Sequence, residues 1–287
     1  MLSGTLSPEN ARLLKDGEGK SLEEILRQAA PDRSIEDGSV EDGSVEVGSL
    51  ENVRLAKDYY HAFVELHIEQ GPLLERKGIP VGIVTAIAAP AALRVTIEGA
   101  GGHAGAVLMP DRRDAFLAAA EIALAVESTA KATRSVDSVA TTGVCKIFPG
   151  AVNSIPSRAV LEIDVRDIDL ARRDGMLSAI RAACEAVGAK RHVRVEVELI
   201  NADAPAQASP LITEALTQSC RALGIESMPM VSRAYHDSLF MSRIAPAGML
   251  FIPCRNGVSH RPDEYAAPED IKRGVQVLAS ALAQLAQ

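Results

Sequence analysis

The sequence predicts an α/β protein in which a ferredoxin-like α+β unit is inserted into a larger domain built on a mostly parallel sheet. Residues 81–89 form a continuous apolar run, which is typical of a strand buried on both faces of such a sheet. After Pro90, apolar Leu93, Val95 and Ile97 alternate with polar residues, which indicates a half-exposed strand and a change of domain. The segments that follow have the order β-α-β-β-α-β, the split βαβ arrangement of ferredoxin-like folds.

The other elements of the inserted unit are assigned from periodicity. We expect helices over 112–129 and 170–187 and strands over 138–148, 158–167 and 192–200. In the strand over 158–167, one face is apolar and Arg166 projects from the opposite, polar face. The chain therefore divides into residues 1–90 of the larger domain, the inserted unit at 91–203, and residues 204–287, which return to the larger domain.

The two outer parts carry their own local signals. Ser21-Leu22-Glu23-Glu24 is a capping box, so a short helix should begin there and run to about Ala30. Residues 36–51 form an acidic near-repeat rich in Gly and Ser, which predicts a solvated low-complexity insertion. Towards the C-terminus we expect a helix over 211–223, a buried strand over 248–254 and an amphipathic helix over 268–285.

Composition excludes several classes of partner. The formal charge of −8 at pH 7 disfavours nucleic acid and anionic membranes, because both bind basic surfaces. The four cysteines are widely spaced, which disfavours a disulfide framework and a zinc knuckle. The sequence shows neither a run of about 18 apolar residues nor a signal peptide, so we expect a soluble protein. Its compartment stays open between the cytoplasm and, for a longer eukaryotic form, the endoplasmic reticulum.

Three histidines lie in settings that suit metal binding or catalysis. His67 and Gln70 lie three residues apart where an apolar run ends, a rigid place from which to offer a ligand; the alternative is a hydrogen-bonded core histidine. His103 lies in the glycine-rich segment 99–105, which could equally be a hairpin with an exposed histidine. His260 follows a buried strand, where open α/β sheets bind ligands.

Two polar residues of the inserted unit suit a carboxylate ligand. Asn153 lies in the turn before the strand over 158–167, and Arg166 lies on the polar face of that strand. A guanidinium fork and an amide donor together match a carboxylate. The alternative is that Arg166 pairs with Asp164 or Asp167 in a surface ion network.

Five motifs, taken together, resemble one known family. They are His67-Ile68-Glu69-Gln70-Gly71, His103-Ala104-Gly105 with Arg113-Asp114-Ala115, Asn153-Ser154-Ile155-Pro156, Asp164-Val165-Arg166-Asp167 and Ser259-His260-Arg261-Pro262. Their order and spacing are similar to those of the ureido-hydrolysing amidohydrolases of the dinuclear-metal aminopeptidase-like clan, which act on N-carbamoyl-L-amino acids, allantoate and ureidoglycolate. Residues 103–110 and 234–241 look most like the ureidoglycolate branch.

The resemblance implies a split aminopeptidase-like catalytic domain, partial in this chain, interrupted by a ferredoxin-like lid that also forms a homodimer. The implied activity is metal-dependent hydrolysis of a linear ureide with release of ammonia, in purine and allantoin catabolism. Ureidoglycolate is the preferred substrate, and allantoate or an N-carbamoyl-L-amino acid is the alternative. The implied cofactor is two divalent ions, with manganese preferred and zinc or cobalt as alternatives.

The resemblance also implies roles for individual residues. His67 would bind one metal ion and His260 the other. His103 would stabilise the developing oxyanion and would reach across from the partner subunit. The residues implied to bind the substrate, with the two lid residues holding its carboxylate, are Gln70, Asn153, Arg166, Tyr235 and His236.

The chain departs from the family pattern in one respect. The family has a first His ligand, a bridging Asp and a Glu-Glu pair upstream of the His67 motif. No histidine precedes His61 here, and Glu23-Glu24 has no companion His-x-Asp. We therefore expect that the N-terminal half of the catalytic domain is absent and that this chain alone lacks full activity. A second hypothesis follows: an inactive homologue that dimerises through its lid and keeps the ligand-binding residues.

Overall fold

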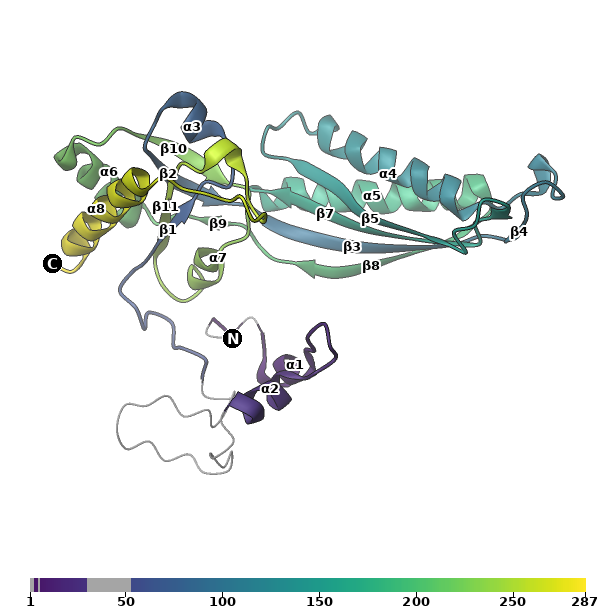
Figure 1. Cartoon of the computed structure of the whole chain (residues 1–287), viewed down its shortest axis with the longest axis horizontal. Helices are drawn as coiled ribbons and strands as arrows, with labels where there is room; N and C mark the ends of the chain where they lie inside the picture. Colours follow the sequence, from purple (N-terminus) through teal and green to yellow (C-terminus); the bar gives the residue numbers. More distant parts are fainter. Residues whose placement is uncertain (1–2, 5, 30–52) are drawn as a thin grey trace.

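The computed structural model describes residues 3–4, 6–29 and 53–287 (Figure 1). Its helices are α1 (Pro8–Leu13), α2 (Leu22–Ala29), α3 (Leu73–Lys77), α4 (Ala115–Ala132), α5 (Leu170–Arg191), α6 (Pro210–Leu223), α7 (Asp237–Met241) and α8 (Pro268–Leu285). Its strands are β1 (Phe63–Ile68), β2 (Val81–Ile87), β3 (Ala89–Glu98), β4 (Gly102–His103), β5 (Val139–Phe148), β6 (Ser154–Ile155), β7 (Arg158–Asp167), β8 (Arg194–Ala202), β9 (Ala206–Gln207), β10 (Ser227–Ser232) and β11 (Ala247–Ile252).

The N-terminal predictions are tested in part. The capping box at the start of α2 is confirmed, because Ser21 N donates to Glu24 Oε2 at 2.6 Å and Glu24 N donates to Ser21 Oγ at 3.2 Å. The acidic repeat at 36–51 and the predicted helix end at Ala30 lie outside the described residues.

The larger sheet has the order β1-β11-β2-β10, and β9 also pairs with β2. β1 runs parallel to β11 and β10 runs parallel to β2, whereas β2 and β11 are antiparallel. The sheet is therefore mixed rather than mostly parallel. The apolar run that suggested a parallel sheet reflects burial on both faces, which a central strand has whatever the direction of its neighbours.

The two faces of the larger sheet carry different helices. Helices α6 and α8 lie side by side on one face (Figure 1), over a core that includes Ile83, Ile212, Leu250 and Val277. This packing is close: a Cβ on Gly274 of α8 would lie 2.7 Å from Ile252 Cγ2, so a larger residue there would displace a neighbouring side chain. The short helices α3 and α7 pack on the opposite face, over the core residues Leu74, Val84, Leu239, Met249 and Phe251.

The inserted unit, called the lid below, has the sheet order β5-β7-β3-β8, with every neighbouring pair antiparallel. When the four strands of this sheet are numbered in chain order, their spatial order is 2-3-1-4, so the predicted ferredoxin-like topology is confirmed. Helices α4 and α5 cover one face of the long sheet (Figure 1). The core between the layers includes Leu93, Ile97, Ile122, Leu161 and Ile180.

The element boundaries differ from the predictions for local reasons. Helix α4 begins at Ala115 rather than near residue 112, because Asp114 accepts hydrogen bonds from Phe116 N and Leu117 N as an N-cap. Strand β3 begins at Ala89, before the proline that suggested the boundary. Pro90 is tolerated because it pairs only with β7; the pairing of β3 with β8 begins at Ala91.

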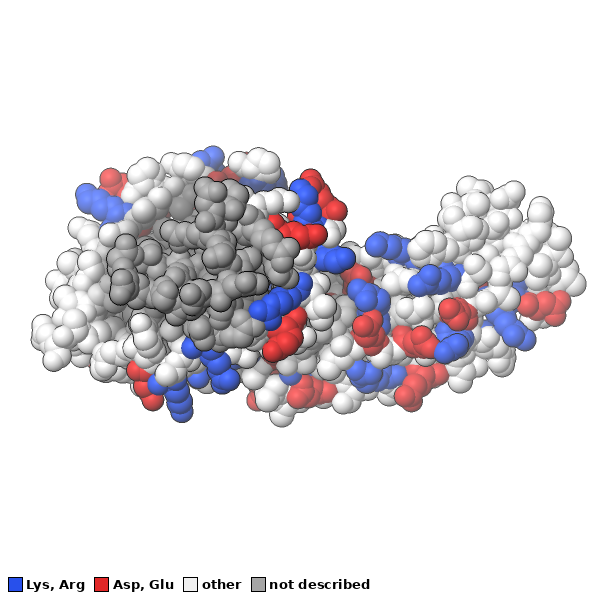
Figure 2. Space-filling model, turned by 90° about the horizontal axis from the view of Figure 1, so that it is seen from below, with Lys and Arg blue, Asp and Glu red and all other residues white. Residues whose placement is uncertain are grey.

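The opposite face of the lid sheet is exposed and carries charges of both signs. Arg94 pairs across the strands with Glu162 at 3.4 Å and Glu198 at 3.1 Å. Figure 2 shows Lys and Arg interspersed with Asp and Glu along this part of the molecule, without a large patch of one sign. Among the described helices, none has the length and apolarity required to cross a bilayer.

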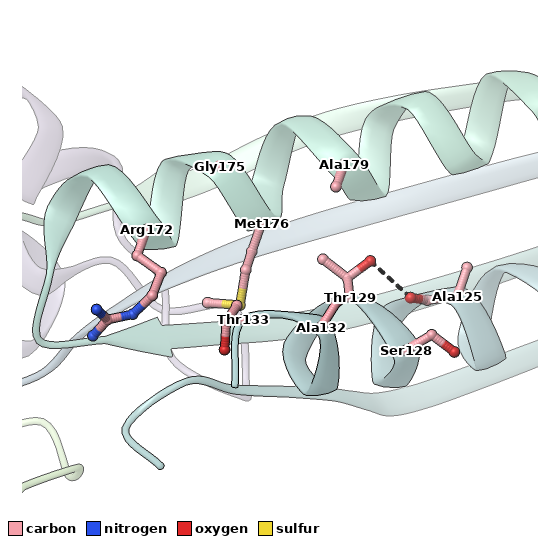
Figure 3. A pocket seen from close by; sticks show the side chains of 9 residues that line it. All are labelled: Ala125, Ser128, Thr129, Ala132, Thr133, Arg172, Gly175, Met176 and Ala179. Atoms are coloured by element: carbon pink, nitrogen blue, oxygen red, sulfur yellow. Dashed lines mark hydrogen bonds between the residues drawn. The ribbon is translucent and has the colours of Figure 1, made fainter. Parts of the chain in front are cut away.

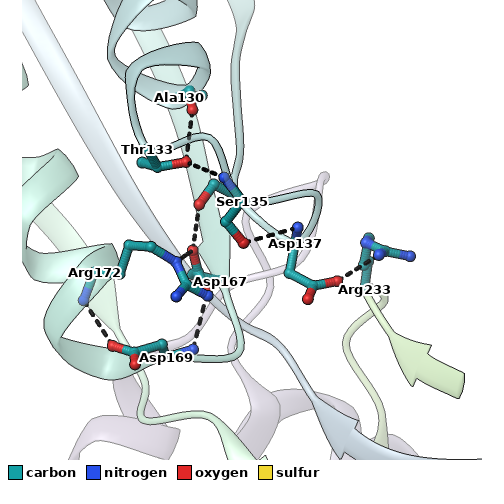
Figure 4. Close-up of polar contacts among 9 residues, drawn as sticks. Ala130, Thr133, Ser135, Asp137, Asp167, Asp169, Arg172 and Arg233 are labelled. Atoms are coloured by element: carbon teal, nitrogen blue, oxygen red, sulfur yellow. Dashed lines mark hydrogen bonds and ion pairs between the residues drawn. The ribbon is translucent and has the colours of Figure 1, made fainter.

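A buried carboxylate fixes the end of the lid nearest the larger sheet (Figure 4). Asp167 is fully buried and accepts from Ser138 Oγ at 2.5 Å, Arg172 Nε at 2.7 Å and the backbone N of Asp169 at 2.9 Å. Burial alone raises the pKa of Asp167, but the hydrogen bonds from Arg172 and Ser138 lower it more, so the pKa lies below its usual value.

We expect this carboxylate to make the lid sensitive to acid. The folded-state pKa of Asp167 is depressed, so its contribution is fully present above the unfolded pKa of about 3.9 and is lost as the pH falls through the folded value. Asp167→Asn should lower the free energy of unfolding at pH 7 by about 1.5–3 kcal/mol, as for hydrogen bonds to a charged group. It should also flatten the decline of that free energy below about pH 4. Urea unfolding from pH 7 to pH 2 measures both; an unchanged slope would contradict the assignment.

Candidate metal and ligand site

Three residues with metal-binding side chains converge on one face of the larger sheet. Strand β1 places Glu65 and His67 on this face, because side chains two residues apart in a strand point to the same side. His236 joins them from the position just before α7. One ligand atom from each of the three lies within 4.8 Å of the others. Two imidazoles and a carboxylate form a donor set that suits zinc, cobalt or manganese.

Hydrogen bonds leave one nitrogen of each histidine available. His67 Nδ1 lies 2.9 Å from the carbonyl oxygen of the next residue and donates to it, which leaves the lone pair on Nε2. His236 Nε2 contacts Ser232 Oγ at 2.7 Å, and its Nδ1 lies 3.6 Å from Glu65 Oε1. Glu65 Oε2 accepts from Ser238 N at 3.0 Å and Ser238 Oγ at 2.6 Å. Outer partners of this kind orient the ligands of metal sites.

His236 is neutral at physiological pH. Burial lowers its pKa to about 4; Glu65 raises the pKa and His67 lowers it, with smaller effects. The side chain of His236 is 2% exposed. Because a metal ion binds neutral imidazole, this environment favours the ligand form and fits a divalent cation.

A cavity of about 620 Å³ adjoins the cluster. Phe251 lines the cavity and packs against both histidines, with ring centroids 6.5 Å from His67 and 5.6 Å from His236. Gln70 also lines it and donates through Nε2 to Ser259 Oγ at 2.9 Å. The three cluster residues do not themselves line the cavity. The cavity adjoins them through the Phe251 ring, and Gln70 presents an amide to it.

Arg166, which belongs to β7 of the lid, also lines this cavity. Its Nε lies 2.7 Å from Asp164 Oδ1 and its Nη2 lies 3.1 Å from Asp164 Oδ2, while Nη1 donates to the carbonyl oxygen of Arg233 at 2.9 Å. The ion pair that the sequence left as an alternative is thus formed with Asp164. Asp167 pairs with Arg172 instead.

The structure places many of the predicted site residues close together, but some of them contact other partners than the sequence led us to expect. His67 and His236 share the three-donor cluster, although His236 was expected only to bind substrate. His260 lines the cavity but is not part of that cluster among the described residues. Tyr235 is 40% exposed, and its hydroxyl donates to Asp203 Oδ2 at 2.5 Å.

His103 and Asn153 lie away from this site, at the far end of the lid (Figure 1). His103 belongs to β4, which pairs with β6, and Asn153 O accepts from Ala104 N at 2.9 Å. Arg166 lies eight residues along β7 from its first residue, which separates the two ends by ~26 Å at 3.3 Å per residue. Asn153 and Arg166 of one chain therefore cannot hold the same carboxylate.

Sequence reasoning marked residues 232–238 as a polar segment that no core needs, but it assigned no role to Glu65, Ser232, Ser238 or Arg233. The alternation in Glu65-Leu66-His67 was a usable signal, because in a strand it places both polar side chains on one face. The contact of Glu65 with Ser238 joins residues 173 positions apart, and a single sequence gives no signal for such a pairing.

A second cavity, of about 680 Å³, lies between α4 and α5 (Figure 3). Small residues line most of it, and its charged lining residue, Arg172, is paired with Asp167. The first cavity has several polar side chains in its lining, Gln70, Arg166, Ser259 and His260, and it adjoins the cluster, so it is the candidate site.

Comparison with known proteins agrees with this geometry. The model of peptidase family M20/M25/M40 matches residues 23–284. A ureidoglycolate hydrolase of Oryza sativa subsp. japonica is 54% identical over 235 residues, covering 82% of this chain and 49% of the relative. An N-carbamoyl-L-amino acid amidohydrolase of Geobacillus stearothermophilus is 38% identical over 288 residues, covering 100% of this chain and 66% of the relative.

Solved structures similar to this chain come from the same group of proteins. The crystal structure of AtUAH in complex with (S)-hydroxyglycine has a TM-score of 0.84 and 48% identity, covering 99% of this chain and 65% of that chain. The chain spans about half to two thirds of the length of the curated relatives it matches. With the family model matching most of its residues, the chain belongs to peptidase family M20/M25/M40, in the group of ureidoglycolate hydrolases, allantoate deiminases and N-carbamoyl-L-amino acid amidohydrolases.

Proposed function

We propose that this protein serves the metal-dependent hydrolysis of a linear ureide, with ureidoglycolate as the preferred substrate and ammonia as a product. The observation that carries the proposal is the cluster of Glu65, His67 and His236 beside a cavity that contains Arg166. Glu65, His67 and His236 would hold a divalent ion, whose chemistry there would be to lower the pKa of a bound water and to polarise the ureido carbonyl. Relatives named for ureidoglycolate, allantoate and N-carbamoyl-L-amino acids support a ureido substrate.

The cavity residues would bind and orient the substrate. Arg166 already forms a two-point pair with the Asp164 carboxylate, which is the geometry with which a guanidinium binds a substrate carboxylate. Gln70 donates to Ser259 through Nε2, and its side-chain oxygen would accept from a ureido N–H. Allantoate and N-carbamoyl-L-amino acids share the ureido and carboxylate groups and are the alternative substrates.

A second metal ion and a second subunit complete the proposal. His260 would hold the second ion from the cavity wall. His103 and Asn153, which lie too far from Arg166 in their own chain, would act from the lid of a partner in a homodimer. His103 would then stabilise the oxyanion that develops on the carbonyl oxygen.

Ammonia release from a substrate panel tests this function. The purified protein is supplied with manganese, zinc or cobalt and then with ureidoglycolate, allantoate or an N-carbamoyl-L-amino acid. Fastest release from ureidoglycolate supports the preferred assignment, and faster release from a carbamoyl amino acid would overturn the choice of substrate. Binding of metal and of glyoxylate without ammonia release would favour the inactive, dimerising homologue.

Arg166→Ala is expected to weaken binding of a small carboxylate such as glyoxylate by about 2–4 kcal/mol, because the anion would lose its charged partner. Glyoxylate is a suitable probe, since AtUAH has been crystallised in complex with it. Isothermal titration measures the dissociation constant. Arg94→Ala is the control, because Arg94 pairs with glutamates on the exposed lid face. Equal glyoxylate affinity in both variants would exclude this role for Arg166.

A further inference from the structure

Residues 232–238 connect three parts of the molecule, and we call this segment the strap. It leaves the end of β10, passes beside the lid and enters α7. Its first residue, Ser232, is buried, and Ser232 Oγ accepts from Ala234 N at 3.2 Å and contacts His236 Nε2 at 2.7 Å. The strap is therefore held in one folded shape by its own hydrogen bonds.

Two lid residues contact the strap at Arg233, one of them through the ion pair drawn in Figure 4. The Arg233 guanidinium pairs with Asp137, which lies in the loop between α4 and β5. The backbone carbonyl of the same residue accepts from Arg166 Nη1 at 2.9 Å. One residue of the strap thus contacts both the α4–β5 loop and the arginine that lines the cavity.

The segment just after β8, where the chain leaves the lid, contacts the strap at Tyr235. Tyr235 donates to Asp203 Oδ2 at 2.5 Å, and Arg243 of the larger domain contacts Asp203 Oδ1 at 2.7 Å. Arg173 of α5 is 2% exposed and donates to the carbonyl oxygen of Asp203. Asp203, just after β8, therefore ties the lid helix, the strap and the larger domain together.

The other end of the strap supports the candidate metal ligands. His236 belongs to the cluster, and Ser238 donates twice to Glu65, through its backbone N and its Oγ. The contacts alternate along the strap: Arg233 and Tyr235 meet the lid and its return segment, and His236 and Ser238 meet the cluster. A displacement of the lid would therefore reach the Glu65–His67–His236 cluster through only a few residues of the strap.

We propose that the strap couples the position of the lid to the Glu65–His67–His236 cluster, with Arg233 as the positioning residue. Arg166 donates a hydrogen bond to the carbonyl oxygen of Arg233. An anion that draws Arg166 away from Asp164 therefore also moves the strap. The consequence for bound ligands rests on the proposed function: glyoxylate binding and metal binding are then linked, each strengthening the other by the same factor.

The coupling is tested first without ligand, by amide hydrogen exchange followed by NMR. Arg233→Gln and Asp137→Asn should each speed exchange at Ser238, which neither residue contacts, by about fivefold or more, the lower end of typical coupling between sites. Arg233→Lys, which can still pair with Asp137, should keep the slow exchange of the Ser238 amide seen in the unmodified protein. Arg94→Gln is the matched control, because the side chains of Arg94 and Arg233 are each 42% exposed. Unchanged exchange at Ser238 in Asp137→Asn would overturn the proposal.

The second measurement is the dissociation constant of Mn²⁺ with and without glyoxylate. In the unmodified protein glyoxylate should tighten Mn²⁺ binding, and in Asp137→Asn this factor should shrink towards one. An unchanged factor would mean that the two ligands interact directly, and the strap would have no positioning role. If neither ligand binds but Ser238 exchange still responds to Asp137→Asn, the coupling stands and the proposed function fails.

Discussion

Replacing Phe251 with alanine is expected to lower the free energy of unfolding by about 3–5 kcal/mol, the usual cost of truncating a buried aromatic side chain. Phe251 is 1% exposed at the end of the central strand β11. Its ring packs against His67 and His236, so its loss leaves a cavity beside both imidazoles. The substitution should therefore also loosen the cluster.

Urea unfolding of Phe251→Ala, followed by circular dichroism, measures the first effect. Phe116→Ala is the matched control, because it removes the same atoms from a side chain that is 39% exposed in the first turn of α4. Phe251→Leu should recover part of the loss, since leucine fills much of the volume. If Phe251→Ala were as stable as Phe116→Ala, the packing described for this strand would be wrong.

Local patterns predicted the elements well where one face of a helix or strand is buried. The final helix has the predicted bounds of residues 268–285. In β7, Leu161 and Ile163 are buried while Arg166 points to the polar side, as alternation required. These features depend on periodicity within one segment, which a sequence displays directly.

Features that depend on pairing between distant segments were not predictable in this way. The opposite directions of β2 and β11 leave no trace in either strand's composition. The five-residue helix α7 is too short for a periodic signal, yet it positions His236 and Ser238. The family resemblance placed Asn153 and Arg166 at one carboxylate, but the length of β7 shows that they do not meet there within one chain.

Removal of the His67 side chain is expected to weaken binding of Mn²⁺ or Zn²⁺ by at least about 100-fold. Loss of an outer partner of a metal ligand typically costs 10–100-fold, and loss of a ligand costs more. His67 Nε2 is free to bind, since Nδ1 donates to the carbonyl oxygen of Ile68. Glu65→Gln should also weaken binding, because a neutral amide replaces the anionic donor.

Metal analysis of His67→Ala after dialysis against each ion, followed by isothermal titration, measures this loss. His61→Ala is the control, because His61 is exposed and lines a different cavity, beside α6 and α8. A metal that binds the folded cluster should stabilise the unmodified protein by about 2.7 kcal/mol at a concentration of 100 times the dissociation constant, and His67→Ala should lose that stabilisation. If His67→Ala retained both the ion and its stabilising effect, the ion would be held by other residues. The convergence of Glu65, His67 and His236 would then serve only the packing of α7 against the sheet.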